Sequence, residues 1–122
     1  MEMGYTAEQD AMRAELRGYY ERLLDEATGK GPRRVGNQRC ADGWAGIGWP
    51  KEYGGQGRSA IEQFIFFDES MRAGAPVPML SINTVGPTIM NFGTDQQKEF
   101  FLPKILAGDV HFCIGYSEPN AG

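Results

Sequence analysis

Three capping boxes divide most of the chain into helices. In a capping box, a Ser or Thr stands three residues before a Glu or Gln, and each side chain accepts a hydrogen bond from the other residue's backbone N–H at a helix start. Glycines or prolines follow each of the three segments, and such residues end helices. The pattern therefore predicts an all-α helical bundle. The three pairs are Thr6 with Gln9, Ser59 with Glu62, and Thr94 with Gln97.

The first predicted helix carries one apolar stripe and is expected to end near residue 28, before Gly29, Gly31 and Pro32. Apolar residues recur there at helical spacing, while charged residues fill much of the other side. We expect the stripe to pack on the same domain, which makes this helix a docking element and not a site. The stripe consists of Met12, Leu16, Tyr19, Tyr20, Leu23 and Leu24.

The helix that begins after Ser59 is dense in apolar residues, so burial on more than one side is expected. A stripe of Phe and Met is more often core than a cofactor site. Asp68 and Glu69 are adjacent, and neighbouring side chains on a helix diverge in direction. We interpret them as solubilising carboxylates and not as a catalytic pair. The apolar positions are Ile61, Phe64, Ile65, Phe67 and Met71.

Residues 43–57 form a glycine-rich connector that also contains Trp44, Trp49 and Tyr53. Glycines allow the backbone to approach the faces of large rings, which predicts a rigid loop without regular structure. No strand precedes Gly54 and Gly55, and no Lys-Ser/Thr pair follows them. A nucleotide-binding loop is therefore excluded.

Prolines and glycines set the remaining helix boundaries. A helix is predicted over residues 79–85, after an extended stretch at residues 75–78. Pro87 fits the first position of the next helix, which Gly93 ends. Pro103 is expected to restart a short helix that Gly108 closes. The helical domain is accordingly predicted to cover residues 1–109.

Residues 110–122 differ in character from everything before them. A short apolar and aromatic run with β-branched members follows Gly108-Asp109, which is turn chemistry. Pro119 and Asn120 then require the backbone to turn. We expect one incipient β-strand and a turn here, opening a second domain that is truncated at residue 122.

Composition excludes several classes of protein. The net charge of −4 argues against nucleic-acid binding, which needs a basic face. No apolar run reaches the length of a membrane span. Cys40 and Cys113 are interpreted as two buried thiols of a reducing cytoplasm, with a disulfide between them as the alternative. No zinc site is credible with so few Cys and His residues, and His111 is interpreted as a packed or surface residue.

Four stretches, in order, resemble the acyl-CoA dehydrogenase family. Residues 116–122 (Tyr-Ser-Glu-Pro-Asn-Ala-Gly) resemble a family signature in which Ser or Thr precedes Glu-Pro and Ala-Gly follows. Residues 43–57, 86–98 and 101–108 are similar to the family as well. The resemblance spans most of the chain beyond residue 40. It implies an N-terminal helical domain followed by the first strand of a middle β domain.

The resemblance also implies a reaction and a set of candidate residues. Members of the family remove an α proton with a carboxylate while a hydride leaves the β carbon for FAD. By position, Ser117 should offer its hydroxyl and N–H to the edge of the flavin ring, and Tyr116 its backbone. The helix over residues 79–85 corresponds to one that lines the acyl cavity, although simple packing is an equally good interpretation. The candidate wall residues are Ser81, Ile82, Thr84 and Val85.

The family's catalytic glutamate lies beyond the residues of this chain, so no catalytic residue and no metal ligand is assigned. We expect this polypeptide alone neither to hold FAD tightly nor to turn over acyl-CoA. Residues 30–34, a small basic cluster, could meet the phosphates of coenzyme A, but a solvated loop is the simpler interpretation. A short helix is expected from about Arg34 to Asp42.

The resemblance implies partners too: an acyl-CoA substrate, an electron-transfer flavoprotein or similar acceptor, and a homo- or hetero-tetramer at full length. Residues 48–57 and 114–119 resemble actinobacterial members, some of which are two-gene heterotetramers acting on sterol side-chain CoA esters. The alternative is a non-catalytic helical subunit, or a truncated paralogue, that serves only in assembly.

Overall fold

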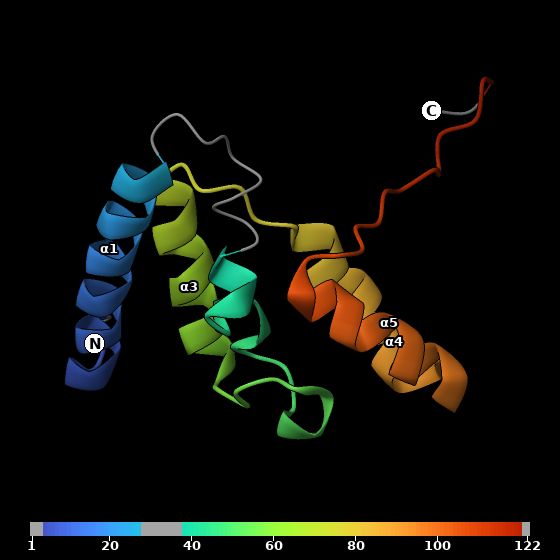
Figure 1. Cartoon of the computed structure of the whole chain (residues 1–122), viewed down its shortest axis with the longest axis horizontal. Coiled ribbons are helices and arrows are strands. Elements are labelled where there is room, and N and C mark those ends of the chain that lie inside the picture. The colour runs from blue at the N-terminus through green and yellow to red at the C-terminus, as the bar shows by residue number, and fades with distance from the viewer. Residues whose placement is uncertain (1–3, 28–37, 121–122) are drawn as a thin grey trace.

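The computed structural model describes residues 4–27 and 38–120, and these residues are mostly helical (Figure 1). No sheet is present among them, which confirms the all-α prediction. Residues 38–41 form a short helical turn. The other elements are α1 (Ala7–Ala27), the 3₁₀ turns η1 (Trp44–Gly46) and η2 (Lys51–Tyr53), α3 (Ala60–Arg72), the π-helical η3 (Leu80–Val85), α4 (Gly86–Phe92) and α5 (Asp95–Ala107).

All three capping boxes are formed, which confirms the helix starts expected from the sequence. At the start of α3, the Ser59 hydroxyl accepts from the Glu62 N–H at 3.3 Å, and the Glu62 carboxylate accepts from the Ser59 N–H at 2.9 Å. Thr94 and Gln97 form the same reciprocal pair at the start of α5. Thr6 and Gln9 do so before α1. Each box satisfies two N–H groups that the helix leaves unbonded.

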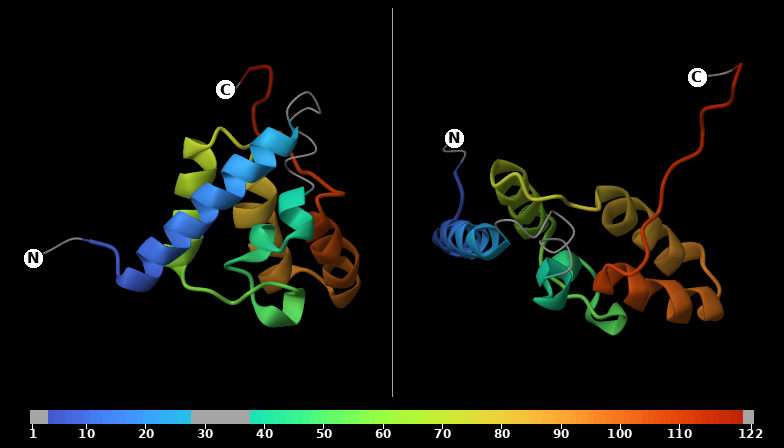
Figure 2. Two further views of the ribbon diagram at one scale, coloured as in Figure 1. Left: turned by 60° about the vertical axis from the view of Figure 1, so that its left-hand side comes forward. Right: turned by 45° about the horizontal axis from the view of Figure 1, so that its top comes forward.

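The helices form two neighbouring pairs, and the connector of residues 43–57 lies between them (Figures 1 and 2). α1 packs along α3, while α4 lies against α5 and η3. The predicted stripe on α1 is buried, since Met12, Leu16, Tyr20 and Leu23 are no more than 7% exposed. It meets Ile65 and its neighbours on α3 within one apolar cluster. The docking role predicted for α1 is therefore confirmed.

Glu69 corrects the interpretation of the α3 carboxylates. Its side chain is only 2% exposed and lies between two arginines of α1. Arg13 Nε is 3.0 Å from Oε1, and Arg17 Nε is 2.8 Å from Oε2. The solubilising role is wrong for Glu69 because the α1–α3 contact brings two cations onto it. Asp68 does lie at the surface, where it pairs with Arg72 one turn along the helix.

Trp49 joins the two helix pairs. Its side chain is 2% exposed, and its indole N–H donates to the Ile82 carbonyl oxygen at 2.9 Å. Gly86, the first residue of α4, lies against the indole so closely that a Cβ there would collide with the ring. Gly55 lies equally close to the Trp49 carbonyl group. The close packing of glycines against rings predicted for the connector is thus observed. The expectation that it lacks regular structure is wrong, because it contains the 3₁₀ turns η1 and η2.

Pro103 does not restart a helix, which corrects the expectation for this segment. α5 continues through it from Asp95 to Ala107 and ends at Gly108, which has a φ of 80°. Proline removes one intrahelical hydrogen bond. The helix persists because Leu102 and Ile105, on either side, are each 1% exposed and anchor it in the core.

The C-terminal segment leaves the helices and runs outward (Figures 1 and 2). Residues 110–117 are not assigned to a strand, and Glu118 has only an isolated bridge. Within the described residues the segment has no ladder partner, so the strand expected here is not formed. Its membership of a second domain stays a prediction.

Replacing Gly86 with alanine should destabilise the fold, because the added methyl would overlap the buried indole of Trp49. We expect a loss of about 1–3 kcal/mol in the free energy of unfolding. Gly115→Ala is the matched control, since a Cβ there meets nothing within 4 Å. Urea unfolding measures both. Equal stability of the two variants would contradict the role given to Gly86.

The Glu69 ion pairs should make stability depend on acidic pH. Hydrogen bonds from Arg17 and then Arg13 lower the pKa of Glu69 below its ordinary value of 4.5, against the opposing effect of burial. A lowered folded-state pKa adds stability above the ordinary value, and this is lost as pH falls through the folded value. Glu69→Gln should therefore flatten the loss of stability between about pH 5 and pH 2.

The exposed Glu99 supplies the control for this pH dependence, since no ion pair involves it among the described residues. Glu99→Gln should leave the pH profile of the wild type unchanged. Thermal unfolding at a series of pH values makes the comparison. A Glu69→Gln profile as steep as that of the wild type would show that the Glu69 pairs do not carry the dependence.

Candidate functional site

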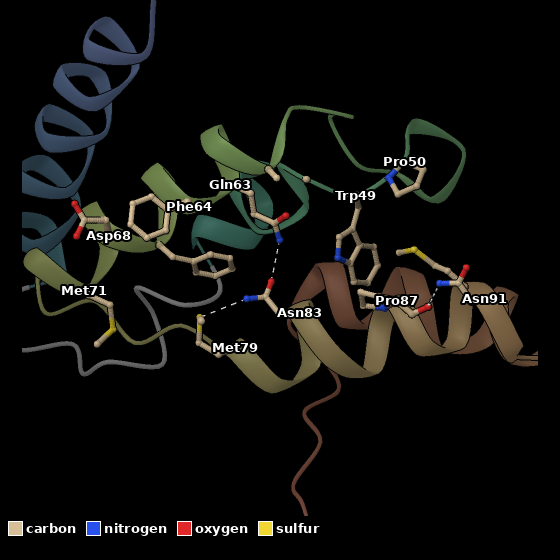
Figure 3. A pocket seen from close by; sticks show the side chains of 14 residues that line it. Trp49, Pro50, Gln63, Phe64, Asp68, Met71, Met79, Asn83, Pro87 and Asn91 are labelled. Atoms are coloured by element: carbon tan, nitrogen blue, oxygen red, sulfur yellow. Dashed lines mark hydrogen bonds between the residues drawn. The ribbon is translucent and has the colours of Figure 1, made fainter. Parts of the chain in front are cut away.

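A groove of about 780 Å³ lies between α3 on one side and η3 with α4 on the other (Figure 3). Its wall is mainly apolar, with a few amides and one carboxylate. The lining residues are Gly48, Trp49, Pro50, Ala60, Gln63, Phe64, Phe67, Asp68, Met71, Met79, Asn83, Pro87, Met90 and Asn91. A concave apolar surface with a few polar groups is typical of a binding site.

The α3 side of the groove corrects the expectation that this helix is buried on more than one side. Ile65 and Phe66 are buried against α1, but Phe64 is 58% exposed and Met71 is 68% exposed. Phe64, Phe67 and Met71 recur at intervals of three and four residues, so they form a second face of the helix. That spacing is visible in the sequence. It predicts a second side of the core, whereas the structure places these residues on a groove.

Amide side chains cross the groove and connect its walls. Gln63 Nε2 donates to Asn83 Oδ1 at 2.9 Å, which links α3 to η3. Asn83 Nδ2 in turn lies 3.8 Å from the sulfur of Met79 (Figure 3). Asn91 donates to the Pro87 carbonyl oxygen one turn earlier, at 2.7 Å. These groups give the apolar groove fixed donors and acceptors near its middle and at one end.

The four predicted acyl-wall residues occupy different faces of η3. Ser81 and Ile82 are buried, at 2% and 1% exposure, while Thr84 is exposed and Val85 is half-buried. None of the four lines the groove; their neighbours Met79 and Asn83 do so. The assignment of these four residues to an acyl wall stays a prediction.

Ser81 has a definite structural contact. Its hydroxyl oxygen accepts a hydrogen bond from the backbone N–H of Phe112 at 3.1 Å. The Phe112 ring also packs edge-on against Phe101 of α5, with ring centroids 5.7 Å apart. These contacts attach the C-terminal segment to η3 and α5 just before it leaves the helices.

The two predicted flavin-facing residues lie beyond that attachment. Tyr116 is 86% exposed, and Ser117 is exposed as well. Neither side chain has a hydrogen-bond partner among the described residues. Their free hydroxyl and N–H groups fit the donor role that a flavin ring edge requires, and nothing in the described structure blocks them.

The two cysteines are not assembled into a site. Both are free thiols, but Cys113 is exposed, so the prediction of two buried thiols is wrong for it. Burial raises the pKa of Cys40, so it is not poised as a nucleophile.

Other sequence candidates also form no site. Among the described residues, no group of three His, Cys, Asp or Glu side chains could hold a metal ion. No helix in that part of the chain could cross a membrane. The basic cluster at residues 30–34 lies outside the described residues, as do the first four residues of the short helix expected from Arg34 to Asp42, of which residues 38–41 are helical.

Comparison with known proteins identifies the class. Residues 6–109 match the family model described as acyl-CoA dehydrogenase, N-terminal domain. The chain therefore belongs to the acyl-CoA dehydrogenase family, as the sequence motifs indicated.

Particular relatives agree with this assignment. The acyl-CoA dehydrogenase FadE26 of Mycobacterium tuberculosis is 54% identical over 135 residues, covering 100% of this chain and 34% of the relative. FadE29 of the same organism is 47% identical over 126 residues, covering 96% of this chain and 33% of the relative. The chain thus spans about a third of the length of these curated relatives.

Solved structures show the same fold. The ChsE4-ChsE5 complex from Mycobacterium tuberculosis aligns with a TM-score of 0.88 at 53% identity, over 100% of this chain and 33% of that chain. A structure described as the Tcur3481-Tcur3483 steroid ACAD aligns with a TM-score of 0.86 at 51% identity, over 100% of this chain and 34% of that chain. The first structure is described as a complex, and both descriptions give two protein names.

Removing the Ser81 hydroxyl should loosen the C-terminal segment, because the Phe112 N–H would lose its acceptor. We expect the Phe112 amide in Ser81→Ala to exchange with solvent roughly tenfold faster. Hydrogen exchange followed by NMR measures this. Thr84→Ala is the control on the same element, since no hydrogen bond from the Thr84 side chain is formed with described residues. Equal exchange at Phe112 in both variants would contradict the attachment.

Proposed function

We propose that this chain is the N-terminal helical part of an FAD-dependent acyl-CoA dehydrogenase, which introduces an α,β double bond into an acyl-CoA thioester. The observation that carries the proposal is the match of residues 6–109 to the N-terminal domain of that family. The groove between α3 and α4 supports it, since a large apolar acyl group needs a concave apolar surface.

In this proposal, the residues of the chain bind and orient but do not take the α proton. FAD, when bound, accepts the hydride from the β carbon. The N–H and hydroxyl groups of Ser117 and the backbone of Tyr116 would donate hydrogen bonds to the flavin ring edge. Donors at that edge stabilise the negative charge that develops on the ring. Met79 and Asn83, which line the groove, would meet the acyl group there. Ser81, Ile82, Thr84 and Val85 would form an acyl wall on the other faces of the same element.

The proposed substrate is a bulky acyl-CoA such as a sterol side-chain ester. One of the similar structures is described as a steroid ACAD, and it covers this whole chain at 51% identity. A groove of about 780 Å³ is large enough for part of a ring system. The proposed partners are a second, different subunit, which the ChsE4-ChsE5 complex supports, and an electron-transfer flavoprotein or similar acceptor. The proposed location is the cytoplasm.

A chimera tests the function directly. The chain is fused through its C-terminus to the remaining two-thirds of FadE26 and produced together with candidate second subunits. The expected product is a yellow protein that reduces an acceptor dye when given an acyl-CoA. The chain alone should be colourless and inactive. A chimera that folds and associates but neither binds FAD nor oxidises any acyl-CoA would favour the assembly role instead.

Two matched variants of the chimera test the flavin-facing segment. Ser117→Ala removes the proposed hydroxyl donor, keeps the backbone N–H, and should weaken FAD binding by roughly tenfold, the value of about one hydrogen bond. Cys113→Ala removes a side-chain heteroatom from the same exposed segment and should leave FAD binding unchanged. FAD affinity is measured by titration of the apoprotein. Equal affinities for the two variants would remove the Ser117 hydroxyl from the proposed site.

A further inference from the structure

Arg39 is a fully buried cation without a hydrogen-bond acceptor among the described residues. Its side chain is 0% exposed, although it lies in the short helical turn at residues 38–41. Nε, Nη1 and Nη2 are all buried, and none has a partner in that part of the chain. Buried polar groups in folded proteins are nearly always satisfied, so this side chain requires an explanation.

The groups around Arg39 offer little compensation. The guanidinium carbon lies 5.9 Å from the centre of the Phe66 ring, at the limit of a cation–π contact. The hydroxyl groups of Tyr20 and Ser70 are bonded to each other, and Ser70 donates to the Phe66 carbonyl oxygen at 2.6 Å. The Arg39 guanidinium lies close enough to the Tyr20 hydroxyl to oppose, through its charge and a weak polar contact, the rise that burial causes in the pKa of Tyr20. The two groups nevertheless form no hydrogen bond of normal geometry.

No carboxylate is free to pair with Arg39 in this part of the chain. Asp42 already accepts from the Tyr19 hydroxyl at 2.8 Å and from Gln38 Nε2 at 2.9 Å. Glu69 is held by Arg13 and Arg17. The ten residues before Gln38, numbers 28–37, contain no Asp or Glu in their sequence. A guanidinium keeps its charge in proteins, so the closed turn holds an unpaired ion in an apolar core.

The turn itself is weakly attached. Its closing backbone bonds run from the Asp42 N–H to the Gln38 carbonyl oxygen at 2.8 Å and from the Gly43 N–H to the Cys40 carbonyl oxygen at 3.0 Å. The Tyr19–Asp42 hydrogen bond lies at an exposed position. A further hydrogen bond, from Gln56 Nε2 to the Gly43 carbonyl oxygen at 3.1 Å, also lies at an exposed position. Opening the turn would break these bonds and hydrate the guanidinium. Hydrating it by separating α1 from α3 would instead expose the Leu16 and Ile65 core.

We propose that Arg39 makes the turn at residues 38–41 a release point, which opens to hydrate the guanidinium while α1 and α3 stay packed. This proposal is independent of the proposed enzymatic function. The open form exposes the Phe66 ring and the end of the connector at Trp44. The Tyr19–Asp42 and Gln38–Asp42 hydrogen bonds stabilise the closed form. Because so few contacts do so, the free-energy difference between the closed and open forms is small.

Hydrogen exchange of the full 122-residue chain, followed by NMR, tests the proposal. In the wild type, the Asp42 and Gly43 amides should exchange at least tenfold faster than the Phe66 amide inside α3. Arg39→Met fills a similar space without a charge. Hydrogen exchange of the Asp42 and Gly43 amides should therefore slow by at least tenfold in this variant, and its melting temperature should rise. Arg22→Met makes the same change at an exposed residue of α1 and should alter neither.

Three results would contradict the proposal that the turn opens separately. Asp42 and Gly43 amides as slow as that of Phe66 in the wild type would show that the turn does not open separately. An Arg39→Met chain that melts lower, or does not fold, would show that the guanidinium makes favourable contacts. Phosphate that slows these amides in the wild type but not in Arg39→Met, at matched ionic strength, would identify a bound anion in place of the opening.

Discussion

The packing of Trp49 against Gly86 is the contact on which the arrangement of the two helix pairs depends. The indole fills the space between the connector and α4, and its N–H is satisfied by the Ile82 carbonyl oxygen. A side chain at position 86 would displace the ring, and the N–H would then be buried without an acceptor. The groove follows from the same contact, because its walls belong to the two pairs that Trp49 joins and the indole itself lines one end.

Local features are readable from the sequence because they depend on residues close together in the chain. The capping boxes, the α1 stripe and the rigid glycine–ring connector all follow from spacing within a few residues. Contacts between distant elements are not readable. Glu69 is buried because α1 brings Arg13 and Arg17 onto it, and no local pattern signals that pairing. The helix through Pro103 escapes prediction for the same reason, since the burial of Leu102 and Ile105 outweighs the local effect of proline.

The candidate site was predictable in outline only. Resemblance to the family indicated η3 as the element that borders the acyl group, and η3 does border the groove. Which side of η3 faces the groove depends on its π-helical winding, which changes the direction of each successive side chain and leaves no mark in the sequence. Arg39 shows the limit most clearly: an arginine in a polar stretch is typical of a surface residue, yet its turn is packed against Phe66.

The attachment of Phe112 to Ser81 couples the two halves of the candidate site. η3 presents Asn83 to the groove beside Met79, and within the same turn it fixes the point from which the segment with Tyr116 and Ser117 departs. An occupant of the groove would therefore contact the same element that anchors the segment. A large occupant that rotated η3 would swing the far end of the segment through a wider arc than a small one. The size of a ligand would thus change the direction of the C-terminal segment relative to η3, through the hydrogen bond between Ser81 and Phe112.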